Sequence, residues 1–136
     1  MFFKKDDNEN NDLSKVAALL IHAAKIDENF SKNEQSIIKQ ALLQIGANDQ
    51  DLEKIFNDGK KIEENSNQIL DFTKEVKNME ENQKIKIVET LWRIIYSNNE
   101  ADIYESNLMR RLTGLLYVDS KIMGDIKEKI KNENSK

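Results

Sequence analysis

Apolar residues recur at spacings of three and four along most of the chain, which is the period of an amphipathic α-helix. Residues 80–97 carry apolar side chains on several sides and are predicted to form the central core helix. A second strongly apolar helix is expected over residues 12–27, capped by Asp12. Five further helices are expected over residues 31–45, 48–62, 69–76, 102–117 and 119–130. A break is expected at Asp58-Gly59, and no segment shows the alternation of a strand. The pattern therefore predicts an all-α bundle of about seven helices.

The same apolar spacing occurs twice. Residues 16–45 align without a gap with residues 87–116, at a constant shift of 71 positions. Leu20 falls on Leu91, and polar residues fall on polar residues at the turn between the two helices. A repeat that preserves both features predicts one helix–turn–helix unit used twice, with pseudo-symmetry between the copies.

The turn of each copy is rich in side-chain oxygens. The candidate ligands are Asp27, Asn29, Ser31 and Glu34 in the first turn, and Asn98, Glu100, Asp102 and Glu105 in the second. Hard cations such as Ca²⁺ and Mg²⁺ bind six or more oxygens, so a divalent cation is one interpretation. Capping alone accounts for Ser31, Glu34, Asp102 and Glu105, which form N-cap pairs at helix starts. Neither turn has the glycine or the spacing of an EF-hand, and no other cofactor is indicated.

Composition excludes several classes of function. The 136 residues include no cysteine and one histidine, which argues against disulfides, structural zinc and thiolate catalysis. The net charge of −4 argues against a nucleic-acid partner. No nucleophile–base pair or glycine-rich phosphate loop is present, so we expect no enzymatic activity, and His22 reads as a core or boundary residue. No apolar run of about 18 residues occurs, so a cytoplasmic location is expected.

The chain is short enough for one domain. The polar, asparagine-rich residues 1–12 are predicted to be disordered. Residues 13–130 form the predicted helical domain, and residues 131–136 a frayed tail.

The second copy resembles the TerB-like (tellurite-resistance protein B-like) family of bacterial proteins. In that family an apolar helix enters an Asp-Gly turn, a glutamate follows, and the next helix carries paired arginines before paired leucines. The matching positions are Trp92, Asn98, Asn99, Tyr104, Glu105, Leu108, Arg110, Arg111, Leu112, Leu115 and Leu116. The first copy has the same motif at Asp27, Ser31 and Glu34. The chain departs from the family at the Asp-Gly pair, which is Asp27-Glu28 in one turn and Asn98-Asn99 in the other.

The resemblance implies an all-helical domain with two pseudo-symmetric helix pairs, and a role for the acidic turns in binding a metal or ligand. It also implies a setting in tellurite resistance and stress response, beside membrane proteins. We therefore expect a non-enzymatic cytoplasmic module that binds a partner protein, either free or at the inner face of the membrane. The alternative is a divalent-cation-binding or metal-responsive protein that uses the two turns. The sequence does not indicate an oligomeric state.

Overall fold

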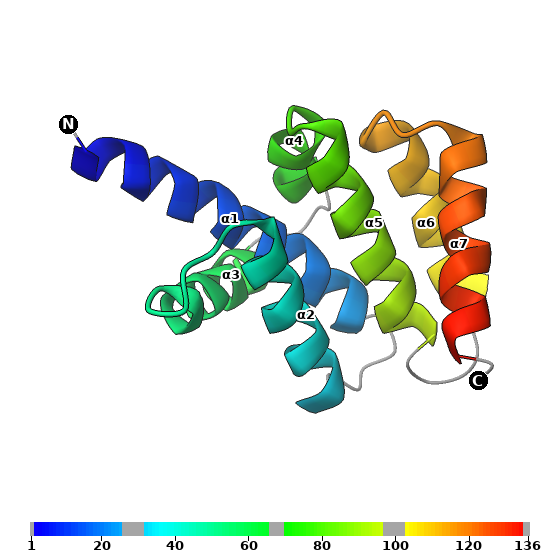
Figure 1. Ribbon diagram of the computed structural model, residues 1–136, viewed down its shortest axis with the longest axis horizontal. Coiled ribbons are helices and arrows are strands. Elements are labelled where there is room, and N and C mark those ends of the chain that lie inside the picture. The colour runs from blue at the N-terminus through cyan, green and yellow to red at the C-terminus, as the bar shows by residue number, and fades with distance from the viewer. Residues whose placement is uncertain (1, 26–31, 66–69, 97–102, 135–136) are drawn as a thin grey trace.

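The described part of the chain consists of seven helices joined by short connections (Figure 1). The computed structural model describes the backbone of residues 2–25, 32–65, 70–96 and 103–134, and the side chains of 13–25, 32–65, 73–74, 76–96 and 107–133. The helices are α1 (Phe2–Ala24), α2 (Lys32–Ile45), α3 (Leu52–Glu64), α4 (Leu70–Lys77), α5 (Glu81–Tyr96), α6 (Ile103–Leu115) and α7 (Ser120–Asn134). The described residues contain no strand, so the predicted all-α class is confirmed.

Both ends of the described chain differ from the sequence-based expectation. Helix α1 begins at Phe2 rather than at Asp12, so residues 2–12 are helical where disorder was predicted. Helix α7 continues to Asn134, through most of the predicted frayed tail. Neither polar segment contains proline or glycine, so nothing in the backbone stops a helix that has already formed.

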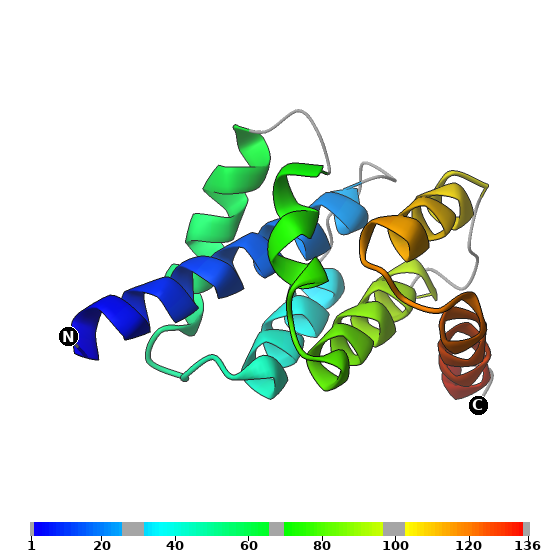
Figure 2. The ribbon, with the colours of Figure 1, turned by 90° about the horizontal axis from the view of Figure 1, so that it is seen from above.

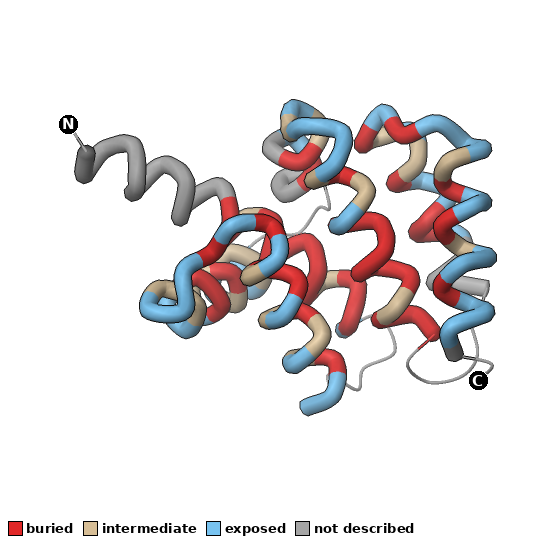
Figure 3. The backbone as a smooth tube through the Cα atoms, in the orientation of Figure 1, coloured by how far each residue is buried: buried red, intermediate tan, exposed pale blue. Residues whose placement is uncertain are grey.

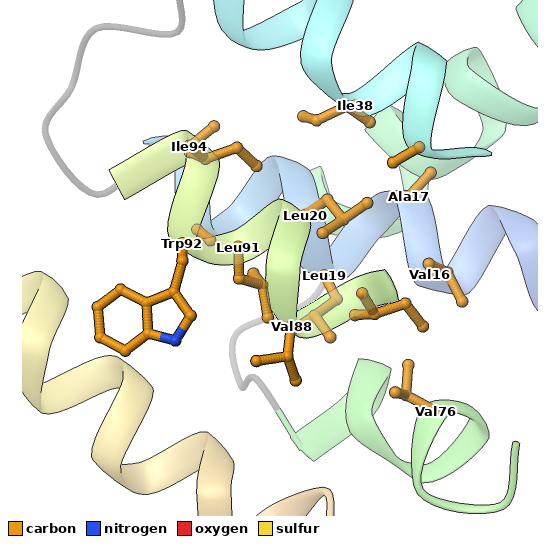
Figure 4. Close-up of a cluster of buried hydrophobic side chains, with 14 of the residues drawn as sticks. Val16, Ala17, Leu19, Leu20, Ile38, Val76, Val88, Leu91, Trp92 and Ile94 are labelled. Atoms are coloured by element: carbon orange, nitrogen blue, oxygen red, sulfur yellow. The ribbon is translucent and has the colours of Figure 1, made fainter. Parts of the chain in front are cut away.

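Helices α1 and α5 form the centre of the molecule. All residues from Val16 to Ile21 are at most 1% exposed. The run from Ile87 to Trp92 is also buried throughout, which Figure 3 shows as a nearly continuous red stretch. Helix α1 packs against α2, α3, α4 and α5, while α5 packs against α1, α2 and α7. A helix with neighbours on several sides must be apolar on several sides, and Figure 4 shows the resulting cluster.

The internal repeat is present in the structure. Helices α2 and α6 begin 71 positions apart, at Lys32 and Ile103. Leu20 and Leu91 are both completely buried in the shared core. Equal spacing in the sequence has therefore produced equivalent helices with equivalent burial.

The repeat also includes a third helix that the sequence comparison did not cover. Ile55 and Gly59 of α3 lie 71 positions before Ile126 and Ile130 of α7, and all four residues are buried. Helix α3 packs on α1 as α7 packs on α5. The molecule thus consists of an N-terminal unit (α1–α3) and a C-terminal unit (α5–α7), joined by α4. Helix α3 lies to the left of centre and α7 at the right in both views (Figures 1 and 2).

The predicted break at Asp58-Gly59 does not occur, because α3 runs through it to Glu64. Gly59 has a packing role instead. A Cβ placed there would lie 2.6 Å from Ala17 Cβ and 3.0 Å from the Ser14 carbonyl oxygen. The missing side chain therefore lets α3 approach the backbone of α1 closely, which offsets the lower helix propensity of glycine.

Candidate functional site

Most of the predicted ligand set lies outside the described residues. The positions concerned are Asp27, Asn29, Ser31, Asn98, Glu100 and Asp102. For Glu105 the structure describes the backbone, as the third residue of α6, but not the side chain. Glu34 is the one candidate ligand whose side chain is described.

Glu34 is the third residue of α2 and is only 1% exposed. An acidic group in the first turn of a helix interacts favourably with the free backbone amides there. Glu105 occupies the corresponding place in α6, so the repeat conserves the position of this glutamate within its helix. Both the capping interpretation and the cation interpretation remain predictions. Within the described ranges, no three His, Asp or Glu side chains are grouped as a metal ion would need.

His22 occupies a boundary position, as predicted. Its side chain is 34% exposed, and Nδ1 lies 3.7 Å from the Glu63 carboxylate. Lys25 Nζ lies 3.0 Å from the other oxygen of Glu63, whose side chain is only 10% exposed. The imidazole and the ammonium group therefore share one carboxylate, and together they link α1 to α3.

Trp92 and Tyr96 are core residues, 3% and 8% exposed. Their rings stack at a centroid distance of 5.8 Å, and the Trp92 indole N–H donates a 3.4 Å hydrogen bond to the Met123 sulfur. Burial raises the pKa of the Tyr96 phenol above its ordinary value of 10.0, and the nearby Glu128 carboxylate raises it further. The pair thus belongs to the contact between α5 and α7.

An open groove runs along the outer face of α2, and we call it the α2 groove. Its volume is about 510 Å³ and its lining residues are Lys32, Gln35, Ser36, Lys39, Gln40, Leu43 and Leu52. The six α2 residues recur at intervals of three or four, so they form one stripe along the helix. Leu43 and Leu52 are half-buried apolar residues at one end of that stripe. The α2 groove could not be predicted from the sequence, because it depends on where α3 begins beside α2.

A second surface lies at the end of α6. Gly46 and Tyr117 are 71 positions apart, and both have positive φ, at +133° and +56°. The amide of the next residue bonds back to the helix in both copies: Ala47 N to Leu42 O at 2.9 Å, and Val118 N to Thr113 O at 3.2 Å. Both helices thus end in the same kind of left-handed cap.

Tyr117 is 68% exposed and is the one exposed large hydrophobic residue in the described part of the chain. Lys77 Nζ, at the end of α4, lies 4.7 Å from its ring centroid. Tyr117 is not among the site residues predicted from the sequence. Extending the aligned repeat by one position pairs Gly46 with Tyr117, so the sequence does show that a tyrosine stands where the first copy has a glycine.

The fold and these surfaces define a class of protein: an all-α domain built from two copies of one three-helix unit around two buried central helices. The model of the family described as Tellurite resistance protein TerB matches residues 13–128. The chain therefore belongs to the TerB family, as its motifs indicated. Searches of curated proteins and of solved structures gave no match. Over the described residues, no helix is both long and apolar enough to cross a membrane.

Proposed function

We propose that this protein is a non-enzymatic interaction module that binds a partner protein. The observation that supports this function best is the α2 groove, about 510 Å³ in volume and open to solvent along one helix face. Small-molecule sites are usually concave and enclose most of their ligand. An open trough beside a helix better fits a segment of another protein.

The chemistry of the α2 groove indicates what kind of segment fits. Leu43 and Leu52 provide an apolar contact for one or two side chains of the partner. Lys32 is exposed and available for an acidic residue. Lys39 is held in place, because its ammonium group lies 2.9 Å from Glu53 and 4.9 Å from the Phe56 ring centroid. We therefore propose an amphipathic partner helix with apolar residues facing the leucines and an acidic residue near Lys32.

Family membership supports a setting in tellurite resistance and stress response, and attachment to a membrane-bound partner at the inner face of the membrane is part of this proposal. We also propose that the protein is not an enzyme. The structural role of its single histidine supports this part of the proposal. His22 faces Glu63, a carboxylate already shared with Lys25, and this arrangement joins two helices.

Site-specific photo-crosslinking tests the proposal. Benzoylphenylalanine would replace Ser36 in the α2 groove, and in a control it would replace the exposed Asn57 of α3. We expect a defined protein adduct from position 36 in cells, absent from position 57. The adduct should disappear when Leu43→Asp is added to the Ser36 variant. Equal labelling from both positions, or no adduct from position 36, would contradict the proposal.

A divalent-cation site at the two acidic turns is the second candidate. It is favoured by the repeat, because Glu34 and Glu105 hold the same position in their helices. Calorimetry with Ca²⁺, Mg²⁺ and Mn²⁺ would give heat and a raised melting temperature if a cation binds. Asp27→Ala and Glu105→Ala should remove that response. If neither the unchanged protein nor the variants respond to ions, and the variants are less stable, then these residues serve as helix caps only.

A further inference from the structure

The left-handed cap is occupied by very different residues in the two units. Gly46 closes α2, and a Cβ added there would meet nothing within 4 Å, so space does not explain the glycine. Its φ of +133° does explain it, because residues with a side chain rarely adopt that conformation. Tyr117 closes α6 at the equivalent position with φ +56°, a conformation that is also unfavourable for a bulky residue.

Core packing does not account for the tyrosine. Its neighbours Leu116 and Val118 are 0% and 5% exposed and anchor the turn, whereas Tyr117 is 68% exposed. Its ring makes a cation–π contact with the Lys77 ammonium group, which lies 4.7 Å from the ring centroid. A strained, exposed aromatic residue that contributes little to the core is typical of a binding surface.

The segment that ends in Tyr117 is basic, although the whole chain carries a net charge of −4. Residues 107–118 contain no acidic residue, and Arg110 and Arg111 are both exposed on α6. Gly114 lies between these arginines and Tyr117 in the sequence, and a Cβ added there would meet nothing within 4 Å. Asp119 is the nearest acid that follows, and its carboxylate accepts a 2.8 Å hydrogen bond from the Lys121 amide as a helix cap.

We propose that Tyr117, Lys77, Arg110 and Arg111 form a docking site, the Tyr117 patch, for an acidic segment of a partner protein. The inference rests on the proposed function in taking a protein as the occupant. Positive charge attracts the segment and sets its orientation. The tyrosine ring supplies apolar contact, and tyrosine and arginine are the residue types that dominate binding energy at interfaces. The open surface at Gly114 lets the backbone of the segment approach α6.

The probe for this site is a fluorescein-labelled decapeptide of glutamate, measured by fluorescence anisotropy beside a glutamine decapeptide. The intact chain should bind the glutamate peptide, more weakly as salt rises, and should not bind the glutamine peptide. Tyr117→Gly should weaken binding at least fivefold without lowering the melting temperature, since it restores the residue type of the first cap. Tyr117→Asn, which also tolerates the left-handed conformation, should behave in the same way.

Charge is tested by a matched pair of double variants. Arg110→Glu with Arg111→Glu should weaken binding at least tenfold. Lys54→Glu with Lys61→Glu makes the same change in net charge on exposed positions of α3 and should leave affinity within twofold. Absence of peptide binding, wild-type affinity in Tyr117→Gly, or equal losses in the two double variants would overturn the proposal.

Two further results separate this proposal from its alternatives. Tyr117-dependent binding to phosphatidylserine vesicles, without peptide binding, would overturn the proposal and assign the patch to a membrane surface. A specific adduct at position 36 together with no peptide binding would leave the proposed function in place and reject only the Tyr117 patch.

Discussion

The N-terminal and C-terminal units join their first and third helices by different packing. In the N-terminal unit, Gly59 of α3 lies against Ala17 of α1, where an added Cβ would come within 2.6 Å of the alanine. The equivalent residues of the C-terminal unit, 71 positions later, are Ile130 and Val88, both completely buried. One unit therefore brings two backbones close together at a glycine, while the other has branched, buried side chains at the equivalent positions.

The ion pairs that link the first and third helices also differ between the two units. A single carboxylate, Glu63, links α3 to α1 in the N-terminal unit through Lys25 and His22. In the C-terminal unit the buried Glu89 of α5 lies 3.3 Å from Lys129 of α7, and Arg93 lies 3.4 Å from Glu133. The comparison shows that a shared apolar pattern fixes which helices meet, while the sizes of a few residues fix how closely they approach.

The largest expected effect on stability comes from shortening the buried side chain of Ile130. Ile130→Ala should lower the free energy of unfolding by about 2–5 kcal/mol, because it leaves a cavity between α5 and α7. Ile122→Ala, at a half-buried position of the same helix, should cost clearly less. Urea unfolding followed by circular dichroism measures both. Equal losses would mean that Ile130 is not a central contact.

The next largest effect on stability comes from adding a side chain at Gly59, where α3 lies close to α1. Gly59→Ala should lower the free energy of unfolding by about 1–3 kcal/mol, because the new methyl group overlaps Ala17 and forces the helices apart. Gly124→Ala is the matched control, since it lies in α7 with nothing within 4 Å of the added Cβ. That change should raise stability by about 0.5–1 kcal/mol through helix propensity. Stabilisation by both substitutions would contradict the close contact of α1 and α3.

Most helices and much of the core could be predicted from the sequence, because they depend on local spacing. The second and fifth helices, the end of α2 at Gly46 and the burial of Leu20 and Leu91 follow from apolar period and cap residues. The role of Gly59 could not be predicted, because it depends on Ala17, which is 42 positions away in the sequence. Local sequence alone predicts a helix break at Gly59, which α3 does not have.

The candidate site was less predictable for the same reason. Acidic turns are visible in a sequence, so they were the first candidates, and seven of the eight predicted ligand side chains lie outside the described set. The α2 groove requires the position of Leu52 relative to α2, which only the fold provides. Tyr117 could have been found, because the repeat extends one position further than the aligned segment.

The caps of the third helices allow a smaller test. Asp119 Oδ1 accepts a 2.8 Å hydrogen bond from the Lys121 amide at the start of α7. Asp51 precedes α3 but makes no side-chain cap hydrogen bond. Asp119→Ala should therefore cost about 1 kcal/mol of unfolding free energy, and Asp51→Ala should cost much less. Thermal unfolding of the two variants measures the difference, and an equal loss would show that Asp119 is not a special cap.

The smallest expected effect is at alkaline pH. Tyr96 aligns with the exposed Lys25 of the N-terminal unit, but its phenol is buried and its pKa is raised above 10.0 by that burial and by Glu128. Its contribution to stability is complete below about pH 10 and is lost as pH rises through the folded-state pKa, because the unfolded chain releases the proton first. Tyr96→Phe should make stability fall less steeply above pH 10, and Glu128→Gln should have a weaker effect in the same direction. Urea unfolding at several pH values measures how steeply stability falls with pH. The same pH dependence in both variants as in the unchanged protein would contradict the raised pKa.

The equivalence of the two caps is tested most directly by the free energies of unfolding of Gly46→Ala and Tyr117→Gly, measured together in urea. Both changes act on one left-handed position of the repeat, where a side chain costs about 1–2 kcal/mol relative to glycine. We predict that Gly46→Ala destabilises the protein by about 1 kcal/mol and that Tyr117→Gly stabilises it by a similar amount, less the entropy that glycine adds to the unfolded chain. Destabilisation by Tyr117→Gly would contradict the account, because it would show that the tyrosine serves the fold rather than a partner.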